Sequence, residues 1–254
     1  MGEGNQIPRT EATVSNDWNL YRTSGVAALI TVLVMVLEMV ITLLPGGSRG
    51  GVEAMTVTEW FDLFQESSFM GLRNLGLMNM LAIFFAIPMY VALYTIHRRG
   101  YGAVAALAAI LYFVGVAIYL ANNTAFSMLS LSQSYAAAAT EAERAMILAA
   151  GKALLARGES HTAGTFLGFL FLDGAGIAIS IVMLRARIFG PVAALAGILG
   201  YLFLLLFDIF SSFVPTLFES AMLFVLIGGP VSLLWDVLIA VKFLKIGFCG
   251  RVAG

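Results

Sequence analysis

The chain has 254 residues, of which 60% are hydrophobic and 11% charged, with a formal net charge of −1. A soluble domain contains about 25% charged residues, so this composition predicts an integral membrane protein. Continuous apolar runs of about 20 residues favour helices over a barrel of short alternating strands. The near-zero net charge gives no basis for nucleic-acid binding, and a single cysteine, Cys249, excludes an internal disulfide.

The apolar runs predict an all-α fold with six transmembrane helices, at about 25–44, 72–95, 102–121, 163–184, 191–213 and 217–243. They form one membrane domain, 24–245, between a polar N-terminal tail, 1–23, and a C-terminal tail, 246–254. Pro45 ends the first run, and Pro88 is expected to kink the second. Pro191 suits the first turn of a helix, so it marks the start of the fifth.

Two capping signals predict helices outside the membrane. Thr56 and Glu59 form a capping box, and an aromatic face follows at helical spacing, with Val57, Trp60, Phe61 and Phe64. This indicates a short interfacial helix after helix 1. Thr140 and Glu143 form a second box, which predicts an outward-facing surface helix over about 141–157 between helices 3 and 4. Gly158 is expected to cap its C-terminus.

Lysines and arginines predict the orientation. Six helices place both tails, the loop between helices 2 and 3, and the loop between helices 4 and 5 on one side. That side holds most of the 14 basic residues: Arg9, Arg22, Arg98, Arg99, Arg185, Arg187, Lys242, Lys245 and Arg251. The positive-inside rule therefore places both termini in the cytoplasm.

Polar residues inside or beside apolar runs are candidates for a ligand or ion site. From the rise per residue, most of them lie toward the outer end: Glu38, Arg73, Asn74, Asn122, Asn123, Asp208 and Glu219. Matched depth predicts that Arg73 pairs with Glu38 or Asp208, which would lower the cost of inserting either charge. Such a pair suits a structural role, and an ion or ligand site stays open as the alternative.

Asp173 lies near mid-depth in the fourth helix, followed by small residues that let another backbone approach. A carboxyl group there must be protonated, paired with a cation, or wetted by a cavity. No second ionisable residue is expected at the same depth, because Glu38 and Asp208 lie further outward and Asp236 further inward. The sequence therefore favours a protonated, structural Asp173 over a proton or cation site.

No catalytic residue, metal site or cofactor is predicted. His97 and His161 are expected at opposite ends of the bundle, so they cannot share one ion, and the HExxH, GxSxG and Walker motifs are missing. Small residues at i, i+4 spacing on helices 4 and 5, such as Gly164 with Gly168, favour close helix contacts. These faces suit a helix partner or a homo-oligomer, in addition to the lipid bilayer.

The order of segments resembles a known family. The stretches that carry the resemblance are YRTSGVAAL, VALYTIHRR, NTAFSMLSLSQSYAAAATEAERAMILAAGKALLA and GTFLGFLFLDGAGIAISIVMLRARIFGPVAALAGILG. Together they resemble the prokaryotic six-helix membrane proteins of domain of unknown function 4386. The resemblance implies six helices and a prokaryotic plasma (inner) membrane, and it brings no established activity and no functional residues.

Three functions are compatible with these patterns. Small-residue faces without a catalytic motif favour a non-enzymatic protein that binds a small molecule or lipid, or an accessory membrane subunit. A small-solute or proton-coupled transporter would use Asp173 and the outer polar cluster, although no internal repeat is visible. An intramembrane enzyme would need two carboxylates on facing helices within reach of each other, which the spacing alone does not indicate.

Overall fold

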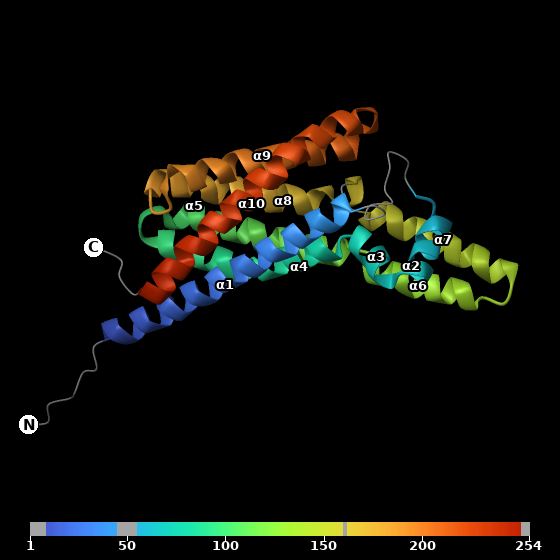
Figure 1. The fold of residues 1–254 in the computed structure, drawn as a ribbon, viewed down its shortest axis with the longest axis horizontal. Coiled ribbons are helices and arrows are strands. Elements are labelled where there is room, and N and C mark those ends of the chain that lie inside the picture. Colours follow the sequence, from blue (N-terminus) through green and yellow to red (C-terminus); the bar gives the residue numbers. More distant parts are fainter. Residues whose placement is uncertain (1–8, 45–54, 160–161, 250–254) are drawn as a thin grey trace, which may run out of the picture.

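The computed structural model describes residues 9–44, 55–159 and 162–249, and this part of the chain is helical with no strand. An elongated bundle contains α1 (Arg9–Leu43), α4 (Leu77–Phe85), α5 (Ile87–Asn122), α8 (Ala163–Ala186), α9 (Gly190–Phe213) and α10 (Phe218–Cys249). Four shorter helices lie at one end of the bundle: α2 (Val57–Glu66), α3 (Ser68–Asn74), α6 (Ala125–Ala137) and α7 (Glu141–Gly158) (Figure 1). We call these four helices the end cap. A 3₁₀ turn, η1 (Pro215–Leu217), joins α9 to α10.

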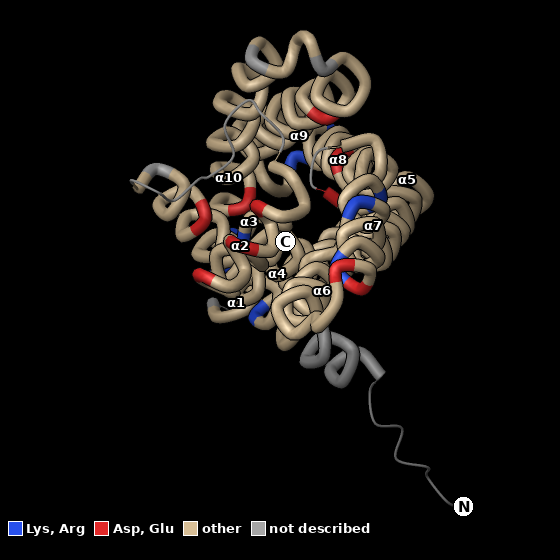
Figure 2. The backbone as a smooth tube through the Cα atoms, turned by 90° about the vertical axis from the view of Figure 1, so that its right-hand side faces the viewer, with Lys and Arg blue, Asp and Glu red and all other residues tan. Residues whose placement is uncertain are grey.

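Five segments of the described chain are long and apolar enough to cross a membrane: Trp18–Thr42, Leu77–Ala137, Glu141–Ala186, Pro191–Phe213 and Ser220–Phe248. The second of them, with 61 residues, is about twice the length that one crossing needs. Most of the backbone in the bundle is uncharged in the view along its axis (Figure 2). The fold is therefore that of an all-α membrane protein.

The long helix α5 folds back on itself. Tyr101 has non-helical backbone angles, and the rings of Tyr90 and Tyr112, on either side of it, stack with centroids 3.6 Å apart. A straight helix would separate these two rings by about 33 Å. The hairpin matches the tight turn predicted after residue 97, and its second arm ends at Asn122, close to the predicted end at 121.

The predicted second helix, 72–95, is not continuous. The backbone breaks at Gly76, which has a φ of +93°, and again at Ala86, just before Pro88. Glycine adopts a positive φ without steric cost, and a Cβ at residue 76 would lie 2.5 Å from the Tyr119 hydroxyl. The kink expected at Pro88 is therefore a full break, and the break at Gly76 is an addition that hydropathy did not indicate.

The end cap has its own small hydrophobic core. Its buried side chains come from all four cap helices and the adjoining turn: Trp60, Phe61, Leu63, Phe64, Leu75, Ala125, Met128 and Leu155. The sequence predicted α2 and α7 at these positions but not α6. Thr56 and Glu59 make the predicted capping box, whereas the Glu143 side chain accepts from the Ala139 N–H instead of that of Thr140.

Gly158 does not cap α7 as predicted. It lies inside the last turn, and Glu159 is the residue that leaves the helix with an extended backbone. A Cβ at Gly158 would be 2.1 Å from the Asn122 carbonyl oxygen. Glycine is required there because α7 passes against the end of α5.

The terminal helices α1 and α10 run antiparallel and extend beyond their apolar runs. α1 begins at Arg9 because no Gly or Pro interrupts the chain before Gly25, and α10 continues to Cys249. The start of α1, the end of α10, the α5 hairpin turn and the α8–α9 turn gather at the end opposite the end cap (Figure 1). The elements predicted to share one membrane side therefore share one end of the bundle.

Candidate functional site

Two carboxyl groups meet inside the bundle. Asp173 on α8 is 5% exposed and Asp208 on α9 is 2% exposed, and their side chains lie within hydrogen-bonding range of each other. The second Asp173 oxygen, Oδ2, has no hydrogen-bond partner among the described residues. The expectation that no ionisable group lies within reach of Asp173 is therefore wrong.

The register of α8 against α9 explains the error. Phe166 contacts Phe213 edge-on at 4.8 Å, and Gly176 leaves room for the Tyr201 ring, so the two helices are antiparallel neighbours. This register places Leu204 opposite Asp173, and Asp208 about one turn further toward the end cap. The predicted offset is correct, but two side chains one turn apart on packed helices can still reach each other.

A carboxyl pair of this kind must hold a proton. Two ionised carboxylates only accept hydrogen bonds, and two like charges in a low-dielectric interior repel strongly. Asp173 makes no ion pair within the described part of the chain. One shared proton removes one charge and provides the donor for the hydrogen bond, as in other carboxyl pairs that share a site.

Three tyrosines continue the polar row toward the opposite end of the bundle. Tyr90 and Tyr201 lie near enough to interact electrostatically with both Asp173 and Asp236, and Tyr112 with Asp236. The Trp235 ring packs against Tyr201 at 5.3 Å and Tyr90 at 6.5 Å. The Asp208–Asp173 pair, these tyrosines and Asp236 thus form a buried row of groups that can carry protons; we call it the polar row.

Sequence reasoning missed the tyrosines of the polar row. Tyrosine is enriched at membrane interfaces, where its hydroxyl reaches water. Tyr90, Tyr112 and Tyr201 instead lie inside apolar runs, and Tyr90 and Tyr112 are buried. Their depth was the available signal, because a phenol away from the interface needs a partner in the bundle.

Arg73 pairs with Glu38, as predicted. Arg73 donates from Nε to Glu38 Oε2 and from Nη2 to Oε1, both at 2.8 Å, in a bidentate contact. It also donates to Asn74 Oδ1 at 3.0 Å and to the Thr42 hydroxyl. The Arg73 side chain is 2% exposed and that of Glu38 28%, so this ion pair lies at the bundle surface with the guanidinium inside.

The other candidates do not join this pair in one cluster. Asn123 donates to the Leu75 carbonyl at 2.8 Å, which supports the break at Gly76, and accepts from the Ala125 N–H to start α6. Asn122 contacts Arg157 at 3.4 Å and the Gly164 carbonyl at 3.4 Å. These asparagines therefore satisfy backbone and cap groups.

Two predicted residues fall outside what the structure describes. Glu219 belongs to α10, but its side chain is not described, and His161 lies wholly outside the described residues. The small residues of α8 and α9 contact other helices of the same chain: Gly168 faces Tyr119, and Gly200 faces Ser232. A homo-oligomer through these two helices stays a prediction.

The family comparison covers most of the bundle. A model of the family described as Domain of unknown function (DUF4386) matches residues 64–242, which include the broken helix, the α5 hairpin and the whole polar row. Comparisons with curated proteins and with solved structures gave no match. The match spans well over half of the chain, so the protein belongs to the family of domain of unknown function 4386.

Proposed function

We propose that this protein is a proton-coupled membrane carrier in which the Asp173–Asp208 pair binds the coupling proton. The observation that carries the proposal is the polar row, which continues from this pair past Tyr90 and Tyr201 to Asp236. Ionisable residues inside a membrane protein are costly, and they commonly mark proton relays. A row of such groups along the bundle suits proton movement between its two ends.

The proposal includes six crossings of a prokaryotic inner membrane, with both termini in the cytoplasm. The α5 hairpin supplies the sixth crossing, because each of its arms runs along the bundle. The gathering of the basic turns and the terminal helices at one end supports this orientation. The end cap and the Arg73–Glu38 pair would then face outward.

Two other functions are less well supported. An intramembrane enzyme needs facing carboxyls, which Asp173 and Asp208 supply, but a hydrolytic site does not need the continuation to Asp236. A non-enzymatic binding protein or accessory subunit would need no proton site at all. The polar row therefore favours the carrier over both.

Infrared titration tests the shared proton. The expected result is a C=O band of a protonated carboxyl group at neutral pH that disappears in both Asp173→Asn and Asp208→Asn. Asp62→Asn changes an exposed carboxylate on α2 and should leave the band intact. Loss of the band in neither of the first two variants would contradict a shared proton.

Proteoliposomes test the carrier. Purified protein is reconstituted around the pH dye pyranine and exposed to panels of small cationic, anionic and neutral solutes. We expect at least one solute to change the internal pH with wild-type protein and with Asp62→Asn, but not with Asp173→Asn. A shared proton in the infrared spectrum, without any solute-dependent pH change, would instead favour the binding or accessory function.

A further inference from the structure

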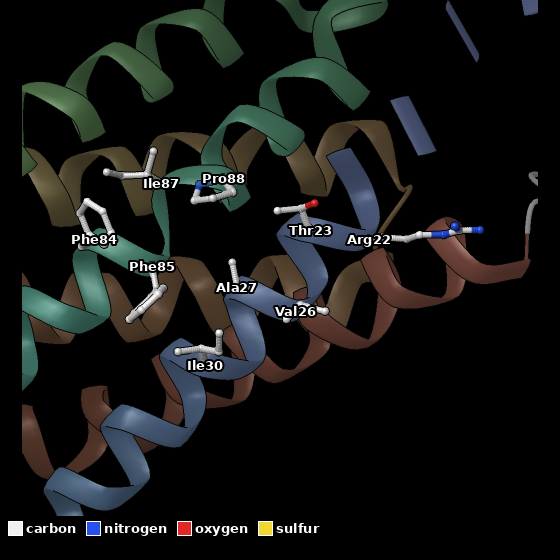
Figure 3. Close-up of a pocket in the computed structure, with 9 residues that line it drawn as sticks. All are labelled: Arg22, Thr23, Val26, Ala27, Ile30, Phe84, Phe85, Ile87 and Pro88. Atoms are coloured by element: carbon white, nitrogen blue, oxygen red, sulfur yellow. The ribbon is translucent and has the colours of Figure 1, made fainter. Parts of the chain in front are cut away.

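An apolar groove lies between α1 and the broken helix α4–α5, away from the polar row. It has a volume of about 620 Å³ and is lined by Arg22, Thr23, Val26, Ala27, Ile30, Phe84, Phe85, Ile87 and Pro88 (Figure 3). Its lining is almost wholly apolar apart from the end at Arg22. Val26 and Phe84 are about half exposed, so the groove opens on the surface that meets lipid.

The break before Pro88 gives the groove a fixed shape. The Ser24 hydroxyl donates to the Pro88 carbonyl at 2.7 Å, and the Thr31 hydroxyl lies 3.3 Å from the Ala82 carbonyl. These two contacts attach α1 to the chain on both sides of the break. The groove is therefore held at two points instead of being a loose gap between two helices.

A fixed cation lies at one end of the groove. The Arg22 side chain points away from the apolar lining (Figure 3), donates to the Gly247 carbonyl, and lies 5.0 Å from the centroid of the Phe248 ring. This is the end of the bundle where α10 finishes and where the α5 turn presents exposed Arg98 and Arg99. Positive charge at a bundle end attracts anionic headgroups.

The length of the groove fits one lipid leaflet. Thr23 to Ile30 covers about 11 Å of helix, which is less than half of a hydrocarbon core of about 30 Å. We propose that the groove binds one acyl chain of an anionic phospholipid whose phosphate is held by Arg22. The site is independent of the proton site, because none of its lining residues belongs to the polar row.

Native mass spectrometry of the delipidated full-length protein tests this site. The protein is titrated with phosphatidylglycerol and with phosphatidylcholine of the same chain length. We expect one phosphatidylglycerol to bind more tightly than the others, and Arg22→Gln to weaken it about fivefold, the effect of one basic residue at an anionic surface. Soluble glycerol phosphate should not compete, because it lacks the chain.

Matched variants separate this groove from general lipid contact. Val26→Trp fills the groove from its exposed rim, whereas Val192→Trp places the same side chain on an exposed face of α9; Arg99→Gln removes a charge at the same end, outside the groove lining. We expect weaker lipid binding for Val26→Trp only, with an unchanged melting temperature. Asp173→Asn should bind lipid normally, so failure of the carrier proposal would leave this result untouched. Equal binding of both lipids, competition by glycerol phosphate, or equal losses in the two Trp variants would overturn the proposal.

Discussion

The molecule holds two pairs of polar side chains that solve opposite problems. In the Arg73–Glu38 pair each charge neutralises the other through two hydrogen bonds, and Glu38 keeps contact with the surface. In the Asp173–Asp208 pair the two groups are alike and both are buried. The first pair is complete without any further species, whereas the second needs a proton. The comparison teaches that burial of charge alone does not mark a functional site, but burial without compensation does.

Removal of Arg73 is the largest test of this difference. Arg73→Met leaves Glu38 without its partner, and breaking a buried ion pair by removing one member costs about 3–5 kcal/mol. We expect a loss near the lower bound, since Glu38 is partly exposed. Unfolding in detergent, followed by circular dichroism against added SDS, measures the change.

The double variant Arg73→Met/Glu38→Met provides the control. It removes both charges, so it should recover part of the lost stability. If Arg73→Met alone changes the free energy of unfolding by less than about 0.5 kcal/mol, which is typical of a neutral surface substitution, the pair is not the structural contact described here.

Gly176 tests whether the carboxyl pair depends on close helix packing. A Cβ there would lie 2.3–2.5 Å from atoms of the Tyr201 ring, whereas a Cβ at Gly174 would meet nothing within 4 Å. Gly176→Ala should therefore cost about 1–3 kcal/mol through overpacking and separate α8 from α9 near Asp173. Gly174→Ala should be neutral or stabilising by up to about 1 kcal/mol.

The infrared carboxyl band and the SDS unfolding curve distinguish these two variants. Gly176→Ala should shift or broaden the band assigned to the Asp173–Asp208 pair, and Gly174→Ala should not. Identical spectra and stabilities for both variants would mean that the helix contact does not position the pair.

Asp173→Asn should change stability less than either of these substitutions. The amide keeps the shape of the side chain and donates a hydrogen bond to Asp208 in place of the shared proton, so we expect a change within about 1 kcal/mol. The same SDS unfolding assay measures it, beside the infrared band that this variant should lose. A loss as large as that of Arg73→Met would show that the carboxyl pair is a structural contact, and the difference between the two pairs would disappear.

Sequence reasoning predicted whatever depends on local chemistry. Hydropathy placed the apolar segments, the Thr56–Glu59 box began α2 at the correct residue, and matched depth identified Glu38 as a partner of Arg73. Each of these follows from spacing along one helix or from distance to the membrane surface. No knowledge of which helices are neighbours was needed.

The remaining features depend on contacts between segments. The meeting of Asp173 and Asp208 follows from the register of α8 against α9, which no local pattern encodes. The break at Gly76 is explained by the Tyr119 hydroxyl and by Asn123, both on the second arm of α5 or just past it. α6 is stabilised by the core of the end cap, so its apolar residues indicate a helix only once α2 is in place.

The smallest expected effect concerns Glu59, an exposed charge that, unlike either pair, faces water. Its pKa lies below the usual value of 4.5 because its carboxylate accepts from the Thr56 N–H at 2.6 Å and from the Thr56 hydroxyl at 2.8 Å. A carboxyl group whose pKa falls on folding binds its proton more weakly in the folded state, so its stabilisation is complete above about pH 4.5 and is lost as the pH falls through the folded pKa. Hydrogen exchange of the α2 amides, corrected for intrinsic rates, should therefore lose protection below that pH in the wild-type protein. Glu59→Gln should remove this acid dependence, because glutamine does not titrate, while Asp62→Asn, an exposed change on the same helix, should keep it. Equal acid dependence in all three proteins would mean that the capping box does not hold the start of α2 in solution.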